Sequence, residues 1–256
     1  MSYPVRNDGG QSWREAGSGD PLVLVHGIGG TTANWLPVIG PLAGAHHVHA
    51  WAFPGYEGAR ALPMEAPMAE DYADRLLAFL DARGIGQAHV VGHSLGAIVV
   101  AALARMAPDR VTRASYVCPV IGAGHLPLEQ RSQMRQGRVS EITGDGMAAF
   151  AEARTGSIIG PSASPEQVAE IIATMAGIPA AAYLQAWEML CGSSILPMLV
   201  PGAAQVAGGD VDPVAPVAAV TQMAEALSVD PVFWPGIGHF PTHEARDALL
   251  AFIRRA

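Results

Sequence analysis

The sequence predicts an α/β fold: a mostly parallel central sheet flanked by helices, with an inserted helical segment. Three observations predict it. Short apolar runs alternate with helical patterns over the first 118 residues, strand patterns then vanish between residues 119 and 194, and both patterns return after that. Runs that are apolar on both faces are typical of central strands in a parallel sheet, and strand–helix alternation supplies the crossover connections. We therefore expect a core of residues 1–118 and 195–256 and a helical lid over residues 119–194.

Each core element is predicted by a periodic run followed by a stop signal. The first strand is the apolar run Leu-Val-Leu-Val before His26-Gly27, and the first long helix has one apolar side and ends at Gly84. Strands are expected at residues 22–25, 48–53, 88–91, 113–117, 198–207 and 230–234. Core helices are expected at residues 68–83, 97–107 and 244–254. In the lid, Gly and Pro breaks separate four short helices, at residues 129–138, 145–154, 165–175 and 180–190.

Composition and charge narrow the class of protein. The chain has 256 residues, half of them hydrophobic and 15% charged, which suits a large buried core and not a disordered chain. A formal net charge of −8 argues against a nucleic-acid binder, because phosphate binding needs clustered positive charge. All 15 basic residues are arginines, so no lysine is available for a Schiff base or a phosphate-binding loop. We expect a small-molecule substrate, no nucleic-acid partner, no cofactor and no metal.

The sequence suggests a protein that stays out of membranes. The first 20 residues are polar and Gly-rich and lack the apolar centre of a signal peptide, and no apolar run has the length of a membrane span. Cys118 and Cys191 lie far apart and form no CxxC pair, which favours two free thiols in a reducing compartment. The expectation is a cytoplasmic monomer or homodimer with no membrane partner.

The sharpest motif is Gly92-His93-Ser94-Leu95-Gly96. It follows an apolar strand and precedes an Ala-rich helix. That is the setting of a nucleophile elbow, a strained turn that exposes the serine hydroxyl at the carboxyl end of the sheet. The alternative is a serine that only caps the helix N-terminus, and the preceding strand argues against it. Ser94 is therefore the predicted nucleophile.

The acid that orients the base is expected downstream of the serine. A serine hydroxyl needs a base, and the base needs a carboxylate to hold it; in this architecture the acid precedes the histidine along the chain. The segment 209–216 offers two carboxylates, Asp210 and Asp212. We favour Asp212, which lies one step deeper in the turn, just before Pro213; the alternative is that either Asp only closes a turn.

His239 is the predicted base, because it lies in a Gly-His-Phe segment after the last strand. Three other histidines cluster on a strand expected at the surface: His46, His47 and His49. His243 and Glu244 resemble two metal ligands on one helix face. Pro241 breaks that segment and the HExxH order is absent, so no zinc site is expected.

An oxyanion hole requires two backbone N–H groups aimed at the developing negative charge. One is expected from Leu95, directly after the nucleophile, and the other from Ile28, in the loop that follows His26-Gly27. The alternative for that loop is a phosphate-binding turn, but no GxGxxG pattern follows the first strand.

Together the motifs resemble the α/β-hydrolase superfamily, and more closely its lid-bearing esterase, lactonase and carbon–carbon hydrolase branch. The resemblance covers nearly the whole chain and implies an α/β-hydrolase fold with a Ser94–His239–Asp212 triad. The family's G-x-x-D-x-x-x-P pattern, from Gly209 to Pro216, again favours Asp212.

Two lid segments, residues 146–151 and 183–187, are similar to enol-lactonases that act on 3-oxoadipate enol-lactone. The chain departs from those lactonases in having the His-Gly pair after the first strand. It also departs from the family in having Ala52 where a structural Asp is usual.

The resemblance implies three candidate functions. The first is hydrolysis of a small, mostly apolar ester or lactone through an acyl-enzyme, and the third is a non-catalytic receptor on the same fold. The second is carbon–carbon bond hydrolysis of a vinylogous diketone, in which an arginine of the lid would bind a carboxylate of the substrate. The lid arginines are Arg131, Arg135, Arg138 and Arg154. The alternative is that these arginines only form a solvated helix face. Five residues are expected to line the substrate pocket: His26, His93, Met147, Phe150 and Trp187.

Overall fold

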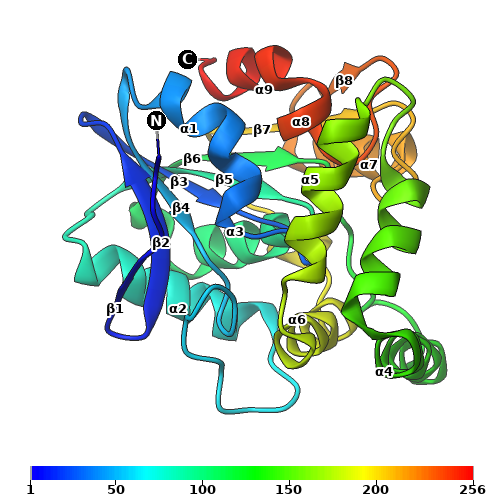
Figure 1. Cartoon of the computed structure of the whole chain (residues 1–256). Helices are drawn as coiled ribbons and strands as arrows, with labels where there is room; N and C mark the ends of the chain where they lie inside the picture. Colours follow the sequence, from blue (N-terminus) through cyan, green and yellow to red (C-terminus); the bar gives the residue numbers. More distant parts are fainter. Residues whose placement is uncertain (1, 256) are drawn as a thin grey trace.

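One mixed sheet runs through the centre of the computed structural model, which describes residues 2–255 (Figure 1). Its strand order is β1-β2-β4-β3-β5-β6-β7-β8. The first two strands pair antiparallel, β2 also pairs antiparallel with β4, and every later pair is parallel. The strands are β1 (Arg6–Asp8), β2 (Gln11–Ala16), β3 (Asp20–Val25), β4 (His46–Trp51), β5 (Ala88–His93), β6 (Val111–Val117), β7 (Ala204–Gly209) and β8 (Val232–Trp234).

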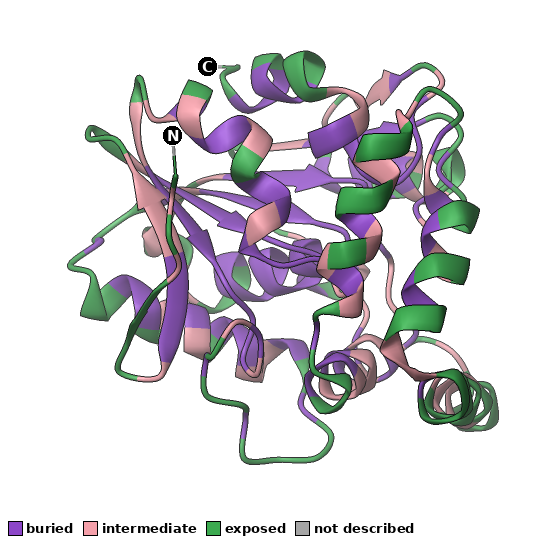
Figure 2. Ribbon diagram, in the orientation of Figure 1, coloured by how far each residue is buried: buried purple, intermediate pink, exposed green. Residues whose placement is uncertain are grey.

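Helices cover both faces of this sheet and explain why β3 is apolar on both of its faces. Helices α2 and α3 pack against each other on one face, and α1 and α9 pack together on the other (Figure 1). The four residues from Leu22 to Val25 are fully buried, and Figure 2 shows the whole centre of the sheet as buried. The helices outside the segment 119–194 are α1 (Leu36–Leu42), α2 (Ala69–Ala82), α3 (Leu95–Met106), α7 (Val217–Leu227), α8 (Pro241–Glu244) and α9 (Arg246–Ile253).

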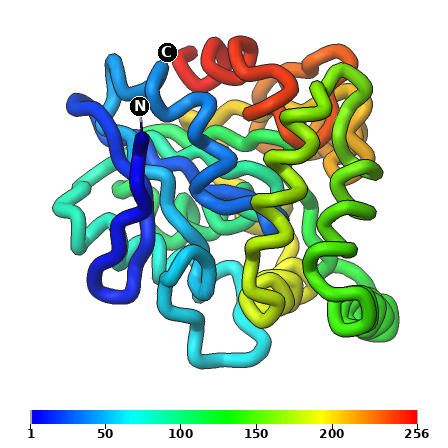
Figure 3. The backbone as a smooth tube through the Cα atoms, viewed as in Figure 1, coloured from blue at the N-terminus to red at the C-terminus, as the bar shows by residue number. Residues whose placement is uncertain are grey.

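The segment between β6 and β7 is helical, and its helices gather along one side of the molecule (Figures 1 and 3). It contains α4 (Leu128–Ile158), α5 (Pro165–Ala176) and α6 (Ala180–Gly192). Its role as a lid stays a prediction. The two helices expected at residues 129–138 and 145–154 both lie within α4, and they meet at a break at Gly146, whose φ of 78° and ψ of 164° are not helical. The other glycines in α4 do not end it, since a glycine inside a helix costs only about 1 kcal/mol.

Several boundaries and elements differ from the sequence prediction. The last helix, expected from residue 244, begins only at Arg246 because Ala245 is non-helical, and the short helix α8 precedes it. The strand expected at residues 198–207 begins only at Ala204. The N-terminal hairpin β1–β2 and the helices α1 and α7 were not predicted. The hairpin corrects one expectation: β2 covers the edge of β4, so the strand with the clustered histidines lies inside the sheet and His49 is 1% exposed.

Within residues 2–255, no single helix has both the length and the apolar character needed to cross a membrane. The bent pair α5 and α6 passes that test together, on length and composition only.

Candidate active site

Ser94 lies in a strained turn between β5 and α3. Its φ of 53° and ψ of −116° lie outside the regions that L-residues prefer, and its N–H donates to the Val117 carbonyl oxygen on β6 at 3.0 Å. Two glycines make this turn possible. A Cβ on Gly92 would lie 2.6 Å from the Gly96 carbonyl oxygen, and a Cβ on Gly96 would clash with the Val25 carbonyl oxygen. The motif is therefore required by backbone packing as well as by chemistry.

The structure joins the three predicted triad side chains in one hydrogen-bonded line. The distance from Ser94 Oγ to His239 Nε2 is 2.8 Å, and the distance from His239 Nδ1 to Asp212 Oδ2 is 2.7 Å. All three side chains are buried. They come from loops after β5, β7 and β8, so the carboxyl edge of the parallel sheet brings together residues that are distant along the chain.

Asp212, and not Asp210, contacts the imidazole. Asp212 Oδ1 accepts the backbone N–H groups of Val214 and Ala215 at 2.8 and 3.0 Å, which leaves Oδ2 for His239. Burial raises the pKa of this carboxyl, but His239 and the two N–H groups outweigh burial and hold the pKa below its ordinary value of 3.8. Asp210 instead accepts the backbone N–H of Gly236.

Two neighbours hold the loop that carries His239. Glu244 Oε1 accepts the N–H of Phe240 at 2.8 Å, while its Oε2 accepts the N–H groups of Gly238 and Gly160 at 2.8 and 2.7 Å. This carboxylate ties the loop to the end of α4. The sequence pattern offers Glu244 only as a possible metal ligand. Its role in holding the loop has no sequence signal, because its three partners are backbone N–H groups that no motif reveals.

His93 supports the same loop from the sheet side. Its Nε2 lies 2.7 Å from the carbonyl oxygen of His239, and the two imidazole rings are 5.0 Å apart. Burial and the neighbouring His239 lower the pKa of His93 to about 3, so the ring is neutral at pH 7. A carbonyl oxygen can only accept, so Nε2 carries the proton and donates to it.

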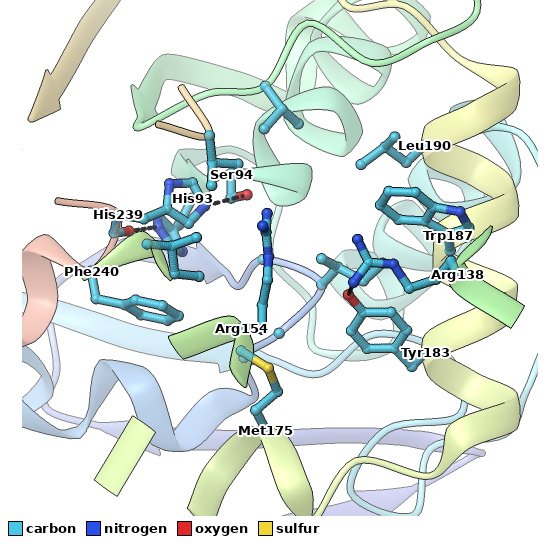
Figure 4. Close-up of a pocket in the computed structure, with 17 residues that line it drawn as sticks. His93, Ser94, Arg138, Arg154, Met175, Tyr183, Trp187, Leu190, His239 and Phe240 are labelled. Carbon is cyan, nitrogen blue, oxygen red and sulfur yellow. Dashed lines mark hydrogen bonds between the residues drawn. The ribbon is translucent and has the colours of Figure 1, made fainter. Parts of the chain in front are cut away.

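A cavity opens beside Ser94 and His239, between the sheet edge and the helices α4 to α6 (Figure 4). Most of its lining is apolar. It is lined by Gly27, Ile28, Gly29, Gly30, His93, Ser94, Val120, Arg138, Arg154, Ile158, Met175, Tyr183, Trp187, Leu190, Val214, His239 and Phe240. Of the five expected pocket residues, His93 and Trp187 are among them.

The other three expected pocket residues lie elsewhere. His26 is buried and does not line the cavity. Its Nε2 accepts the N–H of Phe53, and its Nδ1 lies 2.8 Å from the Gly27 carbonyl oxygen. Phe150 packs against Tyr183 and lines a neighbouring cavity, which shares Arg138 and Arg154 with the cavity beside Ser94. Met147 packs on the apolar core without reaching the cavity beside Ser94. These corrections arise because helix phase and loop direction decide which side a residue faces.

The two expected oxyanion donors lie next to the nucleophile. Leu95 is the first residue of α3, where a backbone N–H has no partner within the helix. Ile28 lines the cavity, and its loop is held by Tyr56, whose hydroxyl donates to the Ile28 carbonyl oxygen at 2.9 Å. Both positions suit a pair of N–H groups near the Ser94 hydroxyl, although their aim at an oxyanion stays a prediction.

Two groups of possible metal ligands come close together within the described chain. In the first, His93, Cys118 and His239, the imidazole of His239 is already engaged in the triad, and burial raises the pKa of the Cys118 thiol well above its ordinary value. The second group lies on β2 and β4 and consists of Glu15, His47 and His49. His243, weighed above as a ligand, belongs to neither group.

Comparison of this sequence with known proteins identifies the family to which the chain is similar. The model of the alpha/beta hydrolase family matches residues 22–252. The dihydrolipoyllysine-residue acetyltransferase component of the acetoin cleaving system from Cupriavidus necator is 39% identical over 42% of this chain and 28% of its own length. The (E)-2-((N-methylformamido)methylene)succinate hydrolase of Acinetobacter baylyi is 30% identical over 49% of each chain. The chain thus spans about half or less of the length of the curated relatives it matches.

Solved structures support the same fold over the whole chain. The enol-lactonase from Burkholderia xenovorans LB400 superposes with a TM-score of 0.81 and 21% identity and covers 98% of both chains. The predicted fold is confirmed, and the chain belongs to the alpha/beta hydrolase family.

Proposed function

We propose that the protein is a serine hydrolase that cleaves a carboxylic ester or a lactone through an acyl-enzyme. The observation that carries this proposal is the continuous line from Ser94 Oγ through His239 to Asp212, with distances of 2.8 and 2.7 Å. A serine hydroxyl in hydrogen-bond contact with an oriented imidazole is the arrangement that activates it as a nucleophile.

The reaction follows from the positions of these groups. Ser94 Oγ attacks the carbonyl carbon while His239 Nε2 takes its proton, and Asp212 stabilises the imidazolium that forms. The N–H groups of Leu95 and Ile28 hold the oxyanion, helped by the positive end of α3. The imidazolium then protonates the leaving alkoxide, and water, deprotonated by His239, releases the acid from Ser94.

A second candidate, carbon–carbon bond hydrolysis, would use the same triad. It is favoured by one observation: Arg138 and Arg154 line the cavity and offer charge to an acidic substrate. The other two lid arginines, Arg131 and Arg135, do not line this cavity. A panel of esters, lactones and vinylogous diketones separates the two candidates, since turnover of a diketone alone would reverse our preference.

We expect a fluorophosphonate probe to phosphonylate Ser94 in the folded protein. Ser94 Oγ displaces fluoride from phosphorus, and His239 takes the proton, so labelling depends on the assembled triad. Intact-mass and peptide mass spectrometry measure the label and its position. Denatured protein is the control and should stay unlabelled. A folded but inert serine would favour the third candidate, a receptor on the same fold.

We also expect Glu244→Gln to lower kcat with little change in KM. One of the two side-chain oxygens becomes an NH₂ group that faces a backbone N–H, so a charge-assisted contact is lost at a cost of about 1–3 kcal/mol. The His239 loop would then leave its productive position. Steady-state kinetics on the best ester measure the effect, with Glu225→Gln on the exposed side of α7 as the matched control. Unchanged kcat in a folded Glu244→Gln variant would contradict this positioning role.

A further inference from the structure

Arg154 extends into the cavity beside the triad from the last part of α4. It lines the cavity together with Ser94 and His239, and Figure 4 shows its side chain running between them and the Tyr183–Trp187 side. Its guanidinium forms no hydrogen bond or ion pair with any of residues 2–255. An arginine that is partly buried and has no partner has its full hydrogen-bonding capacity free for a ligand.

Arg138 lines the same cavity but is already engaged. Its guanidinium lies 4.7 Å from the ring centre of Phe150 and 4.3 Å from that of Trp187, and its Nε lies 3.4 Å from a carboxylate oxygen of Glu141. These contacts hold Arg138 against the helices. The two arginines therefore differ in role: Arg138 supplies a fixed charge, and Arg154 supplies free donors.

The charge balance of the cavity points to an anionic ligand. The chain has a net charge of −8, yet the cavity lining contains two arginines and neither an aspartate nor a glutamate. Burial, and then the neighbouring charge of Arg138, lower the pKa of Arg154, because the more distant carboxylates of Glu141 and Asp212 offset these two effects only in part. A carboxylate placed there would accept hydrogen bonds in place of the water that Arg154 has lost, and it would offset the positive charge of Arg154.

We propose that Arg154 binds a free carboxylate of the substrate, so that the substrate class is a half-ester or lactone that carries a second, ionised carboxyl group. This inference rests on the proposed reaction at Ser94. A guanidinium presents paired N–H donors that match the two oxygens of a carboxylate. The apolar remainder of the lining suits a short hydrocarbon chain between the carboxylate and the reacting carbonyl.

A pair of substrates of similar size tests the proposal: monomethyl succinate, which is anionic, and methyl butanoate, which is neutral. We expect the wild type to prefer the anionic ester. Arg154→Met should lower kcat/KM for monomethyl succinate by about 10- to 100-fold, the range for losing a charge-assisted hydrogen-bonded pair, and leave methyl butanoate nearly unchanged. Arg154→Lys should restore part of the preference, because it keeps the charge without the paired donors.

A surface variant controls for net charge. Arg246→Met removes the same charge from an exposed position at the start of α9 and should change neither substrate's kinetics. An equal loss on both esters in Arg154→Met would overturn the proposal, because Arg154 would then act on the oxyanion or on the fold. Loss of the preference in Arg138→Met with none in Arg154→Met would also overturn it.

A binding measurement separates this proposal from the proposed function. Calorimetric titration of the Ser94→Ala variant with succinate needs no turnover, and we expect binding that the Ser94→Ala/Arg154→Met double variant loses. If the wild type hydrolyses neither ester while this difference is seen, the ester reaction is wrong and the carboxylate site stands. Equal binding by both variants, or by neither, would overturn the carboxylate site whatever the activity.

Discussion

Replacing Ser94 with alanine is expected to lower kcat for the best ester or lactone substrate by about 10⁶-fold, which is the scale of losing a triad nucleophile. Without Oγ no acyl-enzyme forms, and His239 has no proton to take. The rate that remains would come from the oxyanion donors and substrate binding, which act on a water attack. Steady-state kinetics and trapping of the acyl-enzyme by mass spectrometry measure the loss.

The substitution should leave the fold intact. Only one side-chain hydrogen bond, from Oγ to His239, is removed, and the strained backbone depends on packing of the two glycines beside it. Circular dichroism and the Tm check this point. Ser140→Ala, on the exposed side of α4, is the matched control and should keep full activity. Activity that survives in a folded Ser94→Ala protein would show that the reaction uses another nucleophile.

Replacing Asp212 with asparagine is expected to lower kcat by about 10⁴-fold, because the proton of the neutral His239 ring would move to the wrong nitrogen. The backbone N–H groups of Val214 and Ala215 both require an acceptor, so the amide oxygen should stay at the Oδ1 position and the NH₂ group should face His239 Nδ1. Nδ1 must then accept, which places the ring proton on Nε2. An Nε2 that already carries a proton cannot take one from Ser94.

Asp210→Asn provides a control two residues away. Asp210 is exposed and accepts one backbone N–H from Gly236, so this variant should retain most of the activity. Kinetics on both variants with one ester make the comparison, and NMR of the imidazole protons reports the tautomer of His239 directly. A larger loss in Asp210→Asn than in Asp212→Asn would mean that our assignment of the acid is wrong.

The sequence by itself was enough to predict the α/β architecture and the strained turn that carries Ser94. Both depend on local patterns: β3 is apolar at every buried position because helices cover both faces of the sheet, and the Ser94 turn needs its two glycines within a few residues. The order of acid and histidine along the chain follows from the strand order. Short-range physics therefore determines these features wherever the chain lies in the fold.

Only the tertiary structure decided how the site is supported and what it offers a substrate. Three features depend on contacts between segments far apart in sequence. They are the three backbone N–H groups that donate to Glu244, the position of Phe150 in the neighbouring cavity, and the guanidinium of Arg154 that is free to bind a ligand. The hairpin that buries His49 is of the same kind. Such contacts follow from helix phase and long-range packing, which no motif encodes.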